Sequence, residues 1–85
     1  MARHELLLPD LGVEDAAIVL SLWLVKRGAR VLAGDRVAEV LAGPATVDLP
    51  APVDGVLAEM LVDEDELIRV GQPLAVIEME EGRSR

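Results

Sequence analysis

Few side chains in this sequence could perform catalysis or hold a metal ion. His4 is the only histidine, and Ser21 and Ser84 are the only serines, so no convincing Ser/His/Asp set exists for acyl transfer. The acidic run from Asp63 to Glu66 lacks the alternating ligand spacing and the glycine of a calcium-binding loop. We therefore expect a non-enzyme without a metal site, in which His4 is a solvated surface residue and the acidic run is a solvated turn.

Composition excludes several further classes of protein. The chain has 85 residues, no cysteine and a formal charge of −8, so thiolate chemistry and Cys-based zinc sites are absent. Nucleic-acid binding is not expected, because it requires basic patches. The apolar stretch 16–25 is too short to span a membrane, and the apolar start Leu6-Leu7-Leu8 stops at Pro9. We expect a cytoplasmic protein.

The second half of the sequence repeats the first after a shift of 37 residues. The shift aligns glycines and apolar residues at corresponding places: Val19-Leu20 with Val56-Leu57, Leu24-Val25 with Leu61-Val62, Gly34 with Gly71, and Val37-Ala38 with Leu74-Ala75. One offset through all these positions indicates two halves with the same strand plan. We expect one domain over 1–79, with quasi-repeats at about 19–41 and 56–78, and a charged, frayed tail at 80–85.

Short strands between glycine or proline turns are predicted along the whole chain. The expected strands cover 5–8, 18–26, a brief segment near 31, 36–41, 46–49, 55–61, a brief segment near 68, and 73–78. A helix is the alternative for 16–25, since Leu and Ala favour helices. Its partner in the repeat, 53–62, follows Pro50-Ala51-Pro52 and is poor helix material, which favours a strand. We expect Trp23 to pack in the core or at its rim; an exposed partner-binding anchor is the alternative.

Four blocks of this sequence, in order, resemble lipoyl domains of the dihydrolipoyl acyltransferase components of 2-oxo acid dehydrogenase complexes. They lie at Leu8 to Gly12, at Trp23 to Val40, at Ala45 to Leu57 and at Val70 to Glu78. The biotinyl branch of the same family is a looser match, because its Met-Lys-Met hairpin is absent. The resemblance implies an all-β fold: a flattened β-barrel or sandwich of two four-stranded antiparallel sheets with quasi-twofold symmetry, a barrel-sandwich hybrid. It also implies that the hairpin lies at one end and the chain termini at the other.

The hairpin tip departs from the family pattern. Lipoyl domains carry Asp-Lys-Ala there, and the lipoyl group forms an amide with the lysine amine. This chain has Ala42, Gly43, Pro44 and Ala45, so the position equivalent to the lipoyl-lysine is Pro44, which has no amine. If Gly43 and Pro44 were the two central residues of a type I turn, Pro44 would be disfavoured. We therefore expect either a shifted turn with Pro44 as its first central residue or a cis Gly43–Pro44 bond.

These observations lead to one main functional hypothesis and one alternative. The main hypothesis is an unmodified, non-catalytic binding or assembly module without a cofactor, whose partner is a 2-oxo acid dehydrogenase component or a second copy of itself. The apolar tip from Leu41 to Ala45 is either a contact surface or the product of drift. In the alternative, the chain is an acyl-carrier domain that holds lipoate on Lys26, its only lysine, or is altered at position 44.

Overall fold

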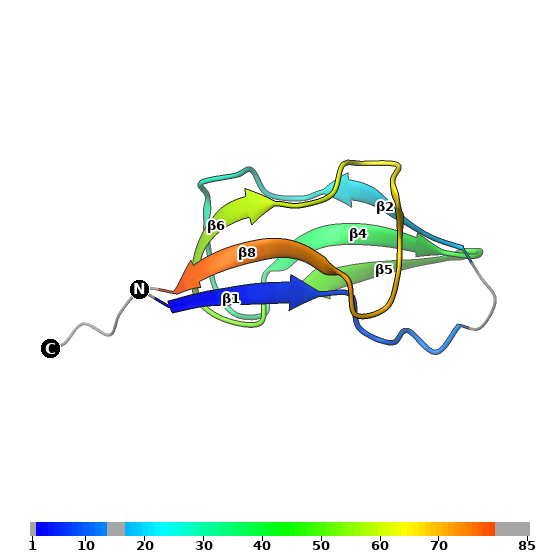
Figure 1. The fold of residues 1–85 in the computed structure, drawn as a ribbon, viewed down its shortest axis with the longest axis horizontal. Coiled ribbons are helices and arrows are strands. Elements are labelled where there is room, and N and C mark those ends of the chain that lie inside the picture. The colour runs from blue at the N-terminus through cyan, green and yellow to red at the C-terminus, as the bar shows by residue number, and fades with distance from the viewer. Residues whose placement is uncertain (1, 14–16, 80–85) are drawn as a thin grey trace, which may run out of the picture.

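The protein folds into eight β-strands, seen in a computed structural model that describes residues 2–13 and 17–79 (Figure 1). The strands are β1 (Ala2–Leu7), β2 (Ile18–Trp23), β3 (Arg30–Val31), β4 (Arg36–Ala42), β5 (Ala45–Pro50), β6 (Gly55–Met60), β7 (Leu67–Ile68) and β8 (Pro73–Met79). Within the described ranges, no helix is long and apolar enough to cross a membrane. The predicted helix alternative for 16–25 is wrong, since β2 begins at Ile18.

Two four-stranded antiparallel sheets form the fold, with strand orders β1-β8-β6-β3 and β5-β4-β2-β7. The fold class predicted from the sequence is therefore confirmed. Ala2 pairs with Met79, so both ends of the described chain meet at one end of the molecule. The β4–β5 hairpin extends from the opposite end (Figure 1).

Three strands of each half obey the 37-residue shift. Adding 37 to the bounds of β2, β3 and β4 gives the bounds of β6, β7 and β8. The bulges follow the same rule: β2 is irregular between Leu20 and Leu22, and β6 between Leu57 and Glu59. The strand plan inferred from the repeat is thus a quasi-twofold symmetry of the backbone.

The halves are interlocked, because each gives a short strand to the other's sheet. β3 of the first half pairs with β6, and β7 of the second half pairs with β2. The loops that lead into these short strands make matching hydrogen bonds. Gly28 N donates to Leu57 O at 2.7 Å, and Asp65 N donates to Leu20 O at 2.6 Å. Neither sheet can therefore be completed by one half of the chain.

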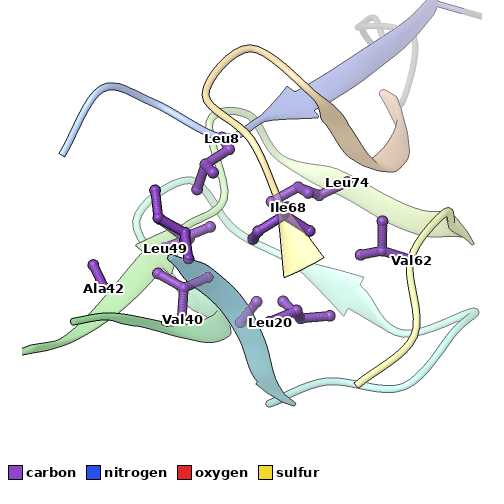
Figure 2. Close-up of a cluster of buried hydrophobic side chains, with 10 residues drawn as sticks. Leu8, Leu20, Val40, Ala42, Leu49, Val62, Ile68 and Leu74 are labelled. Carbon is purple, nitrogen blue, oxygen red and sulfur yellow. The ribbon is translucent and has the colours of Figure 1, made fainter. Parts of the chain in front are cut away.

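The core consists of two apolar clusters between the sheets. One cluster, drawn in Figure 2, centres on fully buried side chains such as Leu20, Val40 and Leu74. The other includes Leu57 and Ile77. Half-buried Trp23 packs against both clusters and its indole Nε1 donates to Val62 O at 3.1 Å, so the predicted core-rim position is confirmed.

The bounds of the strands differ from the predictions mainly at the first two. β1 begins at Ala2 and ends at Leu7, not at Leu8, whose N–H donates to Gln72 O at 3.0 Å outside the ladder. β2 ends at Trp23 rather than at residue 26, because the chain then turns toward the other sheet. The expectation of a frayed tail at 80–85 falls outside the described residues.

The equivalent turn residues Gly28 and Asp65 are chemically different. Gly28 has φ +90° and Asp65 has φ +72°; among the described residues, Asp65 is the only one other than glycine with positive φ. This conformation brings Cβ close to the following carbonyl oxygen, which glycine avoids. The second half therefore keeps a backbone strain that the first half lacks.

We predict that Asp65→Gly stabilises the protein by about 1 kcal/mol, because it removes this strain and one charge from an acidic run. Gly28→Ala should destabilise it by about 1 kcal/mol, although no atom lies within 4 Å of the added Cβ. Urea denaturation of both variants measures these changes. A loss of stability in Asp65→Gly would show that the Asp65 side chain itself supports the turn.

Candidate functional site

The candidate site is the tip of the β4–β5 hairpin. Ala42 pairs with Ala45 across the two strands, which leaves Gly43 and Pro44 as a two-residue loop. Gly43 N also donates weakly to Ala17 O, at 3.4 Å, so the tip is tied to the segment that enters β2. Gly43 and Pro44 therefore form the outermost turn of a regular hairpin, the β4–β5 hairpin of Figure 1.

The geometry of this turn differs from both sequence predictions. The Gly43–Pro44 bond is trans, and Gly43, not Pro44, is the first central residue. Gly43 has φ +61°, whereas the proline ring holds φ near −65°. Positive φ at the first central residue and negative φ at the second define a type II′ turn, whose twist suits a hairpin. The predictions were wrong because they considered type I turns and omitted the mirror-image turns that glycine allows.

The tip is less apolar than the sequence suggested. Ala42 is fully buried and belongs to the core cluster of Figure 2, so it is not available for contact. Gly43, Pro44 and Ala45 are exposed, and Leu41 is exposed on the outer face of β4. The exposed tip therefore offers a proline ring and small groups, with no amine, acid or nucleophile.

Lys26 lies far from the tip along the strands. Ile18, at the start of β2, pairs with Ala42 beside the turn, whereas Trp23 ends β2 opposite Ala38. Lys26 follows Trp23 in the exposed loop beyond that far end, where its carbonyl accepts the N–H of Ala29 at 3.0 Å. Pro44 and Lys26, the two positions that the sequence indicated for lipoyl attachment, therefore lie at opposite ends of β2.

The other candidate residues have structural roles. Two carboxylates of the acidic run accept backbone N–H groups: Glu64 Oε2 from Trp23 at 2.9 Å and Glu66 Oε1 from Asp63 at 2.8 Å. His4 is half-buried on β1 opposite Ile77, on the same side as buried Leu6, and it lines an open hollow beside Arg3 and Glu5. Within residues 2–13 and 17–79, no group of three His, Asp or Glu residues could hold a metal ion.

Comparisons with known proteins agree with this architecture. The family described as "Biotin-requiring enzyme" matches residues 4–77. The chain is 35% identical over 80 residues to the lipoamide acyltransferase component of the branched-chain alpha-keto acid dehydrogenase complex of Pseudomonas putida. That alignment covers 94% of this chain and 19% of the relative. A dihydrolipoyllysine-residue acetyltransferase component of the pyruvate dehydrogenase complex of Staphylococcus epidermidis is 36% identical over 76 residues, covering 87% and 17% of the two chains.

A solved structure supports the fold alone. A single-chain, multi-domain long-chain acyl-CoA carboxylase aligns with a TM-score of 0.75 and 20% identity, over 94% of this chain and 7% of that one. The fold is thus the barrel-sandwich hybrid of biotinyl and lipoyl attachment domains. The chain belongs to the biotinyl/lipoyl-attachment family, and its curated relatives are acyltransferase components of 2-oxo acid dehydrogenase complexes, of which it spans about a fifth.

Proposed function

We propose that this protein is a lipoyl-like domain that carries no lipoyl group and acts as a non-catalytic binding or assembly module. The observation that carries the proposal is Pro44 at the outermost position of the hairpin. An attachment domain needs a lysine amine there, and the type II′ tip offers none. Lys26, the only lysine of the chain, lies beyond the opposite end of β2.

The partner we propose is a protein of the 2-oxo acid dehydrogenase class, in the cytoplasm. The names of the relatives support this proposal, because they describe components of such complexes. The preserved fold supports it as well, since both sheets, the hairpin and the paired strand ends are formed without an acceptor lysine at position 44. A domain that keeps its shape but not its acceptor is suited to being bound rather than to carrying an acyl group.

The test is the intact mass of the protein isolated from its own source, with peptide mapping of residues 24–60. We expect an unmodified chain of 9.1 kDa. A mass raised by one lipoyl group on Lys26 would overturn the proposal and identify the chain as an acyl carrier. A Lys codon at position 44 in the natural gene would overturn it equally.

A further inference from the structure

The outer face of the β5-β4-β2-β7 sheet carries an apolar row close to the hairpin. Val19 on β2 lies directly opposite Leu41 on β4 and Leu67 on β7. Residues in register point to the same side of an antiparallel sheet, and their sequence neighbours Val40, Leu20 and Ile68 are buried. Leu41, Val19 and Leu67, hereafter the apolar row, therefore point outward, and Leu67 is 67% exposed.

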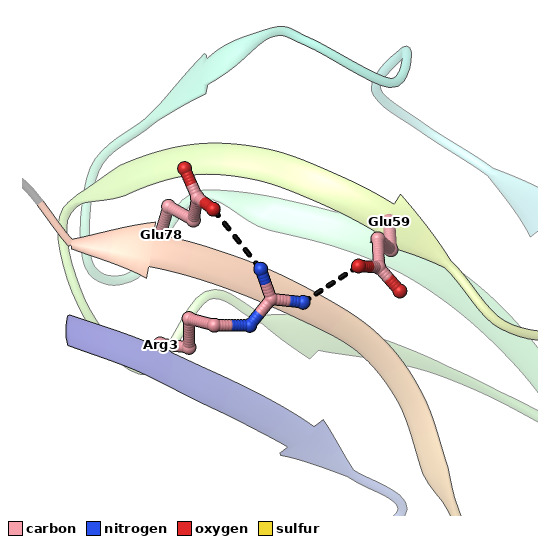
Figure 3. A network of polar contacts seen from close by, with 3 residues as sticks. All are labelled: Arg3, Glu59 and Glu78. Atoms are coloured by element: carbon pink, nitrogen blue, oxygen red, sulfur yellow. Dashed lines mark hydrogen bonds and ion pairs between the residues drawn. The ribbon is translucent and has the colours of Figure 1, made fainter. Parts of the chain in front are cut away.

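The internal symmetry supplies a comparison for this row within the same molecule. The equivalent positions of Leu41, Val19 and Leu67 on the other sheet are Glu78, Val56 and Arg30, which are likewise in register. There Glu78 Oε2 accepts a hydrogen bond from Arg3 at 3.0 Å, and Arg3 also bonds Glu59 at 2.6 Å (Figure 3). The hydrogen bond to Glu59 raises the pKa of Arg3. The fold thus accommodates charges at these positions, so an apolar row is not required for folding.

The apolar surface continues past the edge of the sheet. An open hollow beside β7 is lined in part by Val13, Ala17, Leu67 and Val70, and Val70 is 53% exposed. Contiguous exposed apolar surface of this kind is characteristic of protein-binding sites. The hollow lies next to the same end of β2 that the hairpin tip contacts through Gly43 N.

Two carboxylates, one on β4 and one on β5, border the apolar row. Glu39 lies two residues from Leu41 on β4, opposite Asp48 on β5. Two arginines border the same face: Arg36, which pairs with Asp48 at 3.1 Å, and Arg69, which lines the hollow. These two carboxylates and two arginines balance in charge, whereas the whole chain carries −8, which favours a basic partner over a second acidic copy.

We propose that the apolar row is the docking surface for an amphipathic, basic segment of another protein. Apolar side chains of that segment cover Leu41, Val19 and Leu67, and a Lys or Arg side chain faces Glu39. This inference rests on the proposed binding function and adds to it the surface and the chemistry of the partner.

The test uses the isotope-labelled full chain and a synthetic amphipathic Leu/Lys peptide, followed by NMR. The key variant is Leu41→Glu with Leu67→Arg, which copies the charges of Glu78 and Arg30 and leaves the net charge unchanged. The matched control is Leu61→Glu with Leu32→Arg, which charges two leucines of similar exposure, 45% and 55%, outside the row. Backbone amide shifts report whether each variant keeps the fold, and Leu67→Arg alone is the milder form of the key variant.

We expect peptide-induced shifts at Leu41, Val19 and Leu67, and binding at least about tenfold weaker in the key variant than in the control. Added salt should weaken binding to the wild-type chain, because it screens the exposed carboxylates. Equal weakening by both variants, equal binding of a Leu/Glu peptide, or concentration-dependent shifts of the row without any peptide would overturn the inference. An intact mass that shows a lipoyl group would instead overturn the proposed function and leave the docking result in place.

Discussion

The double substitution Gly43→Asp with Pro44→Lys is expected to convert this protein into a substrate for lipoylation. With a lipoate–protein ligase, lipoate and ATP, the wild-type chain should keep its mass. The double variant should gain one lipoyl group, because it presents an amine at the outermost position of the hairpin and restores the Asp-Lys-Ala tip. Intact mass spectrometry measures the change, which runs from no modification to near-complete modification.

Pro44→Lys alone is expected to be modified at less than about a tenth of the rate of the double variant. Gly43 would keep its positive φ and hold the tip in a type II′ turn, whose first central residue has positive φ, unlike that of type I and type II turns. Aspartate does not adopt the first position of that turn easily, so the second substitution shifts the tip toward a common turn.

Lys26→Arg is the control, made both in the double variant and in the wild-type chain. In the double variant it leaves the engineered lysine as the only lysine in the chain. A mass gain in the wild-type chain that Lys26→Arg abolishes would contradict the reading of Pro44 as a lost acceptor. Equal rates for the single and double variants would show that the ligase does not sense the turn type.

Gly55→Ala is expected to cause a large loss of stability. Gly55 is buried at the start of β6, and an added Cβ would overlap the carbonyl oxygen of Glu78 and lie 2.8 Å from Ile77 Cγ2. The carbonyl belongs to the central strand β8 and cannot move without disturbing its ladder. We expect a cost of about 2–3 kcal/mol and a fall in Tm of about 10–20 °C, measured by thermal denaturation.

Gly71→Ala separates crowding from backbone strain. Gly71 has φ +86°, and nothing lies within 4 Å of an added Cβ, so only strain of about 1 kcal/mol should appear. If Gly55→Ala were no more destabilising than Gly71→Ala, the close approach of β6 and β8 would not limit the size of residue 55.

The repeat made most of the fold predictable from sequence, because six of the eight strands, β2 to β4 and β6 to β8, had a second copy to confirm them. β1 was the least well predicted strand: Arg3 and His4 show no apolar alternation, and only pairing with β8 makes them a strand. The repeat also conceals differences that depend on packing. Ile18 and Gly55 are equivalent positions, yet only Gly55 must lie against a neighbouring carbonyl.

The site was predictable in location but not in shape. The composition of the tip indicated a hairpin without an amine, whereas the turn type depended on φ of Gly43. The apolar row was not predicted, because Val19, Leu41 and Leu67 are far apart in sequence and meet only through the register of three strands. One signal was present, since the 37-residue shift pairs Leu67 with Arg30 and Leu41 with Glu78.

The interlocking of the halves has a consequence for synthesis and folding. β1 pairs only with β8, and Ala2 finds its partner in Met79, almost the whole described chain later. β2 likewise needs β7 to complete its sheet. No closed half exists for a growing chain to form on the ribosome, so folding must await nearly all of the sequence. Such distant pairings close large loops, and we expect slow, all-or-none folding on a timescale of milliseconds to seconds.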